Sequence, residues 1–180
     1  IGNSLLYDMG EYRILRAGID DIMHIHDMAE IVFRHTYKDI LSPEQMEYMM
    51  DWMYSPENLQ KQLEDGHVYH IAFRDNVACG YVSVQPDGIN EEGRLRYHLQ
   101  KIYVLPSEQG HGLGRTLFEC AVKYIRSDAK GKPAALELNV NRNNPSIEFY
   151  RHLGLKILRQ GDFQIGNGFY MNDYIMGADL

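Results

Sequence analysis

Hydrophobic spacing along the first third of the chain predicts helices. Apolar residues recur at helical spacing from about Ile19 to Tyr37, which predicts one buried helix face formed by Ile22, Ile25, Ala29, Val32 and Phe33. The segment before it, Glu11–Arg16, is typical of a short strand. Two Ser-Pro-Glu sequences begin at Ser42 and Ser55 and put proline at the first helical position after a capping residue. We therefore expect a second and a third helix there.

The remainder of the chain predicts mostly strands. His67–Arg74 and Val77–Val84 are expected to form a hairpin around Asp75-Asn76. Next we expect a strand over 95–105, a helix over 112–130, a strand over 134–140, a helix over 145–153, and two strands over 155–164 and 169–176. The predicted class is therefore α/β, a mixed sheet with helices on both faces.

Length and composition fit one globular domain. The chain has 180 residues, of which 44% are hydrophobic and 24% charged, and this excludes disorder as the main state. We interpret residues 11–180 as the domain and 1–10 as an N-terminal extension without function. No apolar run approaches the ~20 residues that span a bilayer, so we expect no membrane partner and no secretion. Two isolated cysteines, Cys79 and Cys120, favour a reducing cytoplasm.

Charge is uneven along the chain. Residues 27–66 hold nine acidic side chains against three basic ones, whereas residues 110–160 hold nine basic against four acidic. These stretches are either solvated helix faces or ligand sites. In the second case the acidic stretch would bind a cationic ligand and the basic stretch an anionic one. The net charge of −7 argues against nucleic acid as a partner.

The segment 101–115, KIYVLPSEQGHGLGR, carries the clearest chemistry. It ends an expected strand, has glycines at alternate positions 110, 112 and 114, and opens an expected helix. Glycines let backbone N–H groups approach a phosphate, and a helix start offers unpaired donors. This predicts a pyrophosphate cradle; the alternative is a glycine-rich turn that binds nothing. The spacing fits neither a dinucleotide fingerprint nor a P-loop.

Two signatures resemble the GNAT acetyltransferase superfamily. Gln109, Gly112 and Gly114 match its cofactor motif, and Leu138-Asn139-Val140, Asn144 and Phe149-Tyr150 resemble its second signature. The resemblance implies a single-domain, mixed, mostly antiparallel twisted sheet flanked by helices on both faces. The acidic front, the segment 101–114 and the tail 166–170 also look like the PaiA-type branch, which is associated with polyamine acetylation.

The resemblance implies roles for individual residues. Backbone groups of Ile102, Tyr103 and Val104 would hold the acetyl and pantetheine portions of acetyl-CoA, and Asn144 would hydrogen-bond the pantetheine arm. Tyr150 would protonate the departing thiolate. The pyrophosphate would lie against Gln109, Gly110, His111, Gly112, Leu113, Gly114 and Arg115. Without the motif, Tyr150 is a half-buried core residue and Asn144 a helix cap.

The expected reaction needs a proton acceptor. An alkyl ammonium has a pKa near ~10.4, so its proton must be removed before the nitrogen attacks. Many relatives carry a glutamate where this chain has His98 and Gln100. His98 could act as the base; the alternative is a partly exposed strand residue. A methionine-rich cluster over 46–54 is either helix packing or part of the wall of an acceptor site.

These observations together predict an enzyme. We expect a cytoplasmic acetyl-CoA-dependent N-acetyltransferase, an acyltransferase, that acetylates a primary amine of a small molecule by direct attack in a ternary complex, with a polyamine favoured. The alternatives are a peptide or protein amine as acceptor, or a CoA-binding module without turnover. Acetyl-CoA is the expected cosubstrate and no metal is expected. The expected partner is a small amine, and a homodimer stays open.

Overall fold

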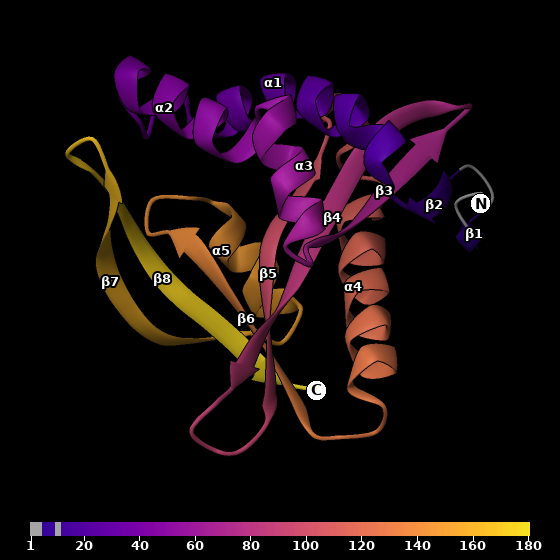
Figure 1. Cartoon of the computed structure of the whole chain (residues 1–180). Coiled ribbons are helices and arrows are strands. Elements are labelled where there is room, and N and C mark those ends of the chain that lie inside the picture. Colours follow the sequence, from indigo (N-terminus) through magenta and orange to yellow (C-terminus); the bar gives the residue numbers. More distant parts are fainter. Residues whose placement is uncertain (1–4, 10–11) are drawn as a thin grey trace.

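The computed structural model describes residues 5–9 and 12–180, and Figure 1 shows the arrangement of its elements. The helical front contains β1 (Leu5–Met9), β2 (Tyr12–Arg16), a 3-10 turn (Ile19–Asp21), α1 (Ile22–Tyr37), α2 (Pro43–Tyr54) and α3 (Pro56–Glu64). The centre contains β3 (Val68–Arg74), β4 (Val77–Ile89), β5 (Leu95–Val104), a 3-10 turn (Pro106–Glu108) and α4 (Leu113–Ala129). The chain continues with β6 (Ala134–Asn141), α5 (Ser146–His152), β7 (Lys156–Gly166) and β8 (Phe169–Asp179).

All described strands belong to one mixed sheet. Their order is β1-β2-β3-β4-β5-β6-β8-β7, and every neighbouring pair is antiparallel except β5 and β6. Helices cover both faces of this sheet: one core packs against α4, and the other packs against α1, α2 and α3. The predicted fold class, a mostly antiparallel mixed sheet between helices, is confirmed. Within the segment 1–10, residues 5–9 form β1 and pair with β2.

Local sequence signals produce the predicted turns and caps. Asp75 and Asn76 both adopt positive φ, +50° and +64°, which matches the right-handed twist of the strands that they join. The Ser42 and Ser55 hydroxyls each accept a hydrogen bond of 3.2 Å from a backbone N–H at the start of α2 and α3. The hairpin and both helix starts therefore form where the residues predict them.

The sheet is larger than its sequence pattern indicates. β4 runs to Ile89, beyond the predicted end at Val84, and its pairing with β5 shifts register between Pro86 and Ile89. Proline has no N–H for the ladder and is tolerated in strands at such irregularities.

Among the described residues, no helix is both long and apolar enough to cross a membrane.

The parallel pair β5 and β6 opens in the middle of the sheet. Its ladder ends at His98 opposite Glu137, although β5 continues to Val104. The pairing of β5 with β4 skips Gln100, because Ser83 faces Lys101 while Val84 faces Leu99. Such a bulge bends a strand and re-aims its side chains. The two strands therefore diverge beyond His98, and the edge of β5 that faces β6 is left open.

Candidate active site

A large cavity lies beside the open edge of β5. Its volume is about 560 Å³, and its walls come from α1, the end of β5, the 106–115 loop, the start of α4, and α5. Most of the residues predicted to bind the cofactor line it: Ile102, Tyr103, Val104, Gln109, Gly110, Gly112, Leu113, Gly114 and Arg115. Tyr150 lines it as well. His98, His111 and Asn144 do not line this large cavity.

The glycines of the 106–115 loop are required for different structural reasons. Gly110 and Gly112 adopt φ of +85° and +79°, in the left-handed region that side chains disfavour, and a Cβ on either would meet no protein atom within 4 Å. A Cβ on Gly114 would lie 3.2 Å from the ring of Phe149. The first two glycines therefore shape an open loop, and the third lets α4 approach α5 and the neighbouring Tyr150.

Glu108 fixes the loop to the sheet. Its carboxylate is buried, accepts a 2.8 Å hydrogen bond from the Tyr12 hydroxyl, and forms an ion pair with Arg74. Burial and this carboxylate raise the pKa of Tyr12 to about 12. Our reading of the sequence missed Glu108, because its partners lie on β2 and β3 and no local spacing indicates them.

Three tyrosines meet where β5 and β6 diverge. The hydroxyls of Tyr37 and Tyr103 are 3.3 Å apart, and the amide of Asn144 donates to the Tyr37 hydroxyl at 3.3 Å. Tyr150 is buried, and burial followed by the proximity of Tyr37 raises its pKa. These side chains and Asn139 line a second cavity of about 30 Å³, the inner cavity, which shares Tyr103 and Tyr150 with the large one. The Tyr150 hydroxyl therefore stays protonated near neutral pH.

Asn144 contacts both the start of α5 and the tyrosine cluster. Its side-chain oxygen accepts a 2.8 Å hydrogen bond from the backbone N–H of Ser146, the first residue of α5, and the N-cap position itself is taken by Pro145. Its amide nitrogen faces the Tyr37 hydroxyl, and the residue lines the inner cavity. Asn144 therefore joins the start of α5 to the tyrosine cluster.

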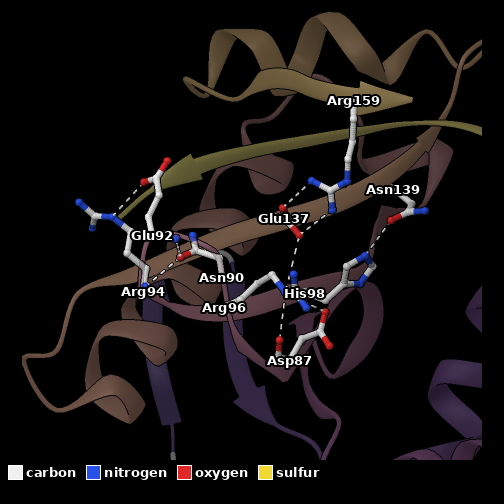
Figure 2. A network of polar contacts seen from close by, with 9 residues as sticks. All are labelled: Asp87, Asn90, Glu92, Arg94, Arg96, His98, Glu137, Asn139 and Arg159. Carbon is white, nitrogen blue, oxygen red and sulfur yellow. Dashed lines mark hydrogen bonds and ion pairs between the residues drawn. The ribbon is translucent and has the colours of Figure 1, made fainter. Parts of the chain in front are cut away.

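His98 lies beside the inner cavity without lining it. Its Nε2 is 2.9 Å from the side-chain oxygen of Asn139, as Figure 2 shows, and its Nδ1 is buried without a hydrogen-bond partner among the described residues. Gln100 lines the inner cavity, where its amide donates to Gln85 at 3.2 Å. His98 thus reaches the inner cavity through Asn139.

A third cavity of about 30 Å³, the distal cavity, lies beyond the inner one. Tyr37 and Asn139 line both, and the distal cavity adds Leu41, Met49, Asn141, Met171 and Asp173. Met49, a member of the methionine-rich cluster, lines the distal cavity. Met46, Met50 and Tyr54 are core residues, and Trp52 is 45% exposed. The acidic side chains of 27–66 are exposed except for the half-buried Glu30, so they do not form this site.

Basic side chains gather outside the large cavity. An open groove of about 500 Å³ between α4 and Leu153 is lined by Arg115, Lys123 and Arg126, together with Glu119. It adjoins the large cavity through Arg115. In the described part of the chain, no three His, Cys, Asp or Glu side chains gather as a metal site would require. The predicted basic rear half therefore concentrates positive charge beside the large cavity.

Comparison with known proteins defines the class. A family model described as the acetyltransferase (GNAT) family matches residues 31–155. The chain belongs to this family, and it is an N-acetyltransferase, an acyltransferase.

Solved structures share the fold. The PaiA N-acetyltransferase from Thermoplasma acidophilum, crystallised with coenzyme A, is 23% identical with a TM-score of 0.75, over 94% of this chain and 99% of that one. A GCN5-related N-acetyltransferase from Rhodopseudomonas palustris is 20% identical with a TM-score of 0.76, over 97% and 99%. Arabidopsis thaliana Naa50, bound to the bisubstrate analogue CoA-Ac-MVNAL, is 16% identical with a TM-score of 0.64, over 94% and 99%.

Proposed function

We propose that this acetyltransferase moves the acetyl group of acetyl-CoA to a primary amine of a small molecule, with linear polyamines favoured, in a ternary complex. One observation carries the proposal: the large cavity, which is bounded by the glycine loop, shares Tyr103 and Tyr150 with the inner cavity, at the point where β5 and β6 diverge. Acetyl-CoA in the large cavity and an acceptor amine in the inner cavity would meet beside Tyr150.

The residues of the large cavity fit coenzyme A. The positive φ of Gly110 and Gly112 leaves open space in which phosphate oxygens could approach the backbone, and the first N–H groups of α4 have no carbonyl partner within the helix. The open edge of β5 at Ile102–Val104 offers backbone groups to an extended amide-containing chain. Arg115, Lys123 and Arg126 line the adjoining groove, where they would favour the phosphates.

Tyr150 is the proposed proton donor. Bound acetyl-CoA supplies the acetyl group as a thioester. Because burial raises the pKa of Tyr150, its hydroxyl is protonated and can give a proton to the sulfur as the acetyl group leaves. Asn144 and Tyr103 hold Tyr37 against the inner cavity, which fixes the polar wall that faces Tyr150.

The proposed function is tested by release of free thiol from acetyl-CoA with a panel of amines. The panel holds spermidine, spermine, monoamines of similar length, and peptides with free N-termini. We expect turnover with small amines and higher kcat/KM for the polyamines. Preferential turnover of peptides would show that the acceptor is a peptide amine. CoA binding without any turnover would show that the protein is a CoA-binding module.

A further inference from the structure

A polar row crosses the sheet beside the cavities. On β6, Leu136, Leu138 and Val140 pack into the core beside α4, so the alternate residues Glu137, Asn139 and Asn141 occupy the opposite face. Asn141 pairs with Asp173 of β8, and directly opposed residues share a face. Asp173 therefore extends this row into the distal cavity, under α1 and α2.

Asp173 is a buried carboxyl group with little compensation. It is 1% exposed, and its side chain accepts a 3.2 Å hydrogen bond from the amide of Asn139. The nearby Arg142 donates to the main-chain carbonyls of Gly161 and Asp173 and to the carboxylate of Asp162. A buried carboxylate is costly unless cations and hydrogen bonds surround it. In the described part of the chain, no cationic side chain forms an ion pair with Asp173, and a cationic group in the distal cavity would supply one.

The other acid of the row, Glu137, is already neutralised. Arg159 contacts both of its carboxylate oxygens, at 3.0 and 3.3 Å, and Arg96 approaches to 3.8 Å (Figure 2). Glu137 lines neither the inner nor the distal cavity. Asp173 is thus the acid of this row that faces a cavity.

We propose that Asp173 receives the ammonium group of the acceptor amine and accepts the proton which that nitrogen must lose. This rests on the proposed function and assigns the acceptor to a class: an alkyl amine that is cationic at neutral pH and slender enough to enter between Tyr37, Met49 and Asp173. Each 30 Å³ cavity has room for a group about the size of a water molecule, as an ammonium group is.

The hydrogen bonds around Asn139 assign His98 a different role from the base expected from the sequence. An ionised carboxylate only accepts hydrogen bonds, so the amide nitrogen of Asn139 faces Asp173 and its oxygen faces His98. The Nε2 of His98 must then carry a hydrogen. His98 is therefore a positioning residue that orients Asn139, and Asn139 in turn orients Asp173.

Charges around Asp173 suit a reversible proton acceptor. Burial raises its pKa, whereas the Asn139 hydrogen bond, Arg142 and His98 act in the opposite direction and favour the ionised form. Tyr37, from α1, lines the same distal cavity, and burial, followed by the charge of Asp173, raises the pKa of Tyr37.

The proposed step balances its atoms. One N–H bond of the ammonium breaks, the proton moves to a carboxylate oxygen of Asp173, and the electron pair stays on nitrogen. That nitrogen then bonds to the acetyl carbon while the carbon–sulfur bond breaks. Tyr150 gives its proton to the sulfur and recovers one from the new amide nitrogen, and Asp173 returns its proton to solvent.

The test compares Asp173→Asn with Asp179→Asn, the same charge change at an exposed residue on the same strand. We measure CoA affinity by calorimetry, and kcat/KM for the best amine from pH 7 to 10. Asp173→Asn should lower kcat/KM about 10²-fold or more at pH 7. The deficit should shrink toward the amine's pKa of ~10.4, where neutral amine is already present. CoA affinity should not change, and Asp179→Asn should behave as wild type.

Three results would overturn the inference. If the wild-type enzyme acetylates amines and a folded, CoA-binding Asp173→Asn variant keeps its kcat/KM, Asp173 has no such role while the proposed function stands. A deficit that is constant across pH would also exclude proton acceptance. If the wild-type enzyme acetylates no amine at all, the proposed function fails first. Asp173→Glu, which keeps the carboxylate, should retain more activity than Asp173→Asn at pH 7; equal losses would contradict the proposal.

Discussion

The two sides of the opening between β5 and β6 are assembled in different ways. The wall of the large cavity comes mainly from one continuous stretch, Ile102–Arg115, to which residues of α1 and α5 are added. The distal cavity draws on α1, α2, β6 and β8, so its residues extend from Tyr37 to Asp173. A continuous wall carries its ligand preference in local spacing, whereas a dispersed wall exists only once the strands have paired. This difference decides which substrate can be predicted from the sequence.

The largest effect should come from the residue between the two sides. Tyr150→Phe keeps the ring and removes the proton donor, so kcat should fall by about 10²–10⁴ while CoA affinity is unchanged. The lower end is expected, because a thiolate with pKa near ~8.5 leaves without full assistance. Steady-state kinetics and calorimetry measure the two quantities. Tyr124→Phe, on α4 outside the three cavities, is the control. Unchanged kcat where chemistry limits the rate would make Tyr150 a packing residue.

The cofactor side alone is tested at its glycine loop. Gly112→Val should weaken CoA binding about 10- to 100-fold, since it strains a residue at φ +79° and fills the space left for phosphate. Calorimetry measures the affinity. Gly131→Val is a matched control, because Gly131 has φ +82° and open space but lies in the turn after α4. Equal CoA affinity in both folded variants would contradict the cradle.

The acceptor side is tested at His98, the residue that orients Asn139. His98→Ala should lower kcat/KM for amines about 3- to 10-fold, because Asn139 loses the part-buried hydrogen bond that orients it. His98→Gln can still donate to Asn139 and should recover most of that loss. A base cannot be replaced by glutamine, so equal losses in both variants would restore His98 as the proton acceptor. The kinetics are measured near neutral pH with saturating acetyl-CoA.

The smallest effect should come from the acidic helix surface. A triple variant, Glu44→Gln with Asp51→Asn and Glu57→Gln, removes exposed charges and should change kcat/KM for spermidine less than about 3-fold at low salt. That change should vanish as ionic strength rises, because exposed charges are screened. The preference for polyamines over monoamines should shrink in parallel. A loss as large as that of Asp173→Asn would move the acceptor site to this surface.

Much of the fold is predictable because its signals are local. The Asp75-Asn76 turn and the Ser-Pro caps depend on neighbours in sequence, and each forms as expected. The extension of β4 past Pro86 was missed, because β5 pairs across the irregularity and compensates for the missing N–H. Residues 5–9 carry no strong strand pattern and pair as β1 at the edge of the sheet.

The candidate site shows the same difference between residues with local sequence signals and residues brought together by strand pairing. The resemblance to the GNAT cofactor motif indicates Gln109, Gly112 and Gly114. Asp173 belongs to no such motif, because its partner Asn139 lies on a neighbouring strand. One signal was present: residues 135–141, ALELNVN, alternate apolar and polar positions, which puts Glu137, Asn139 and Asn141 on one face. Only the register of β6 against β8 adds Asp173 to that row.

The central claim is that coenzyme A and the acceptor bind on opposite sides of the opening between β5 and β6. Its most direct test is a crystal structure with coenzyme A and an N-acetylated polyamine bound together. We predict the pyrophosphate at Gly110–Gly114, the sulfur beside the Tyr150 hydroxyl, and the product nitrogen beside Asn139, which lines both the inner and the distal cavity, within reach of Asp173. Coenzyme A bound away from the glycine loop, or an acceptor that enters from the cofactor side and leaves the distal cavity untouched, would contradict the account.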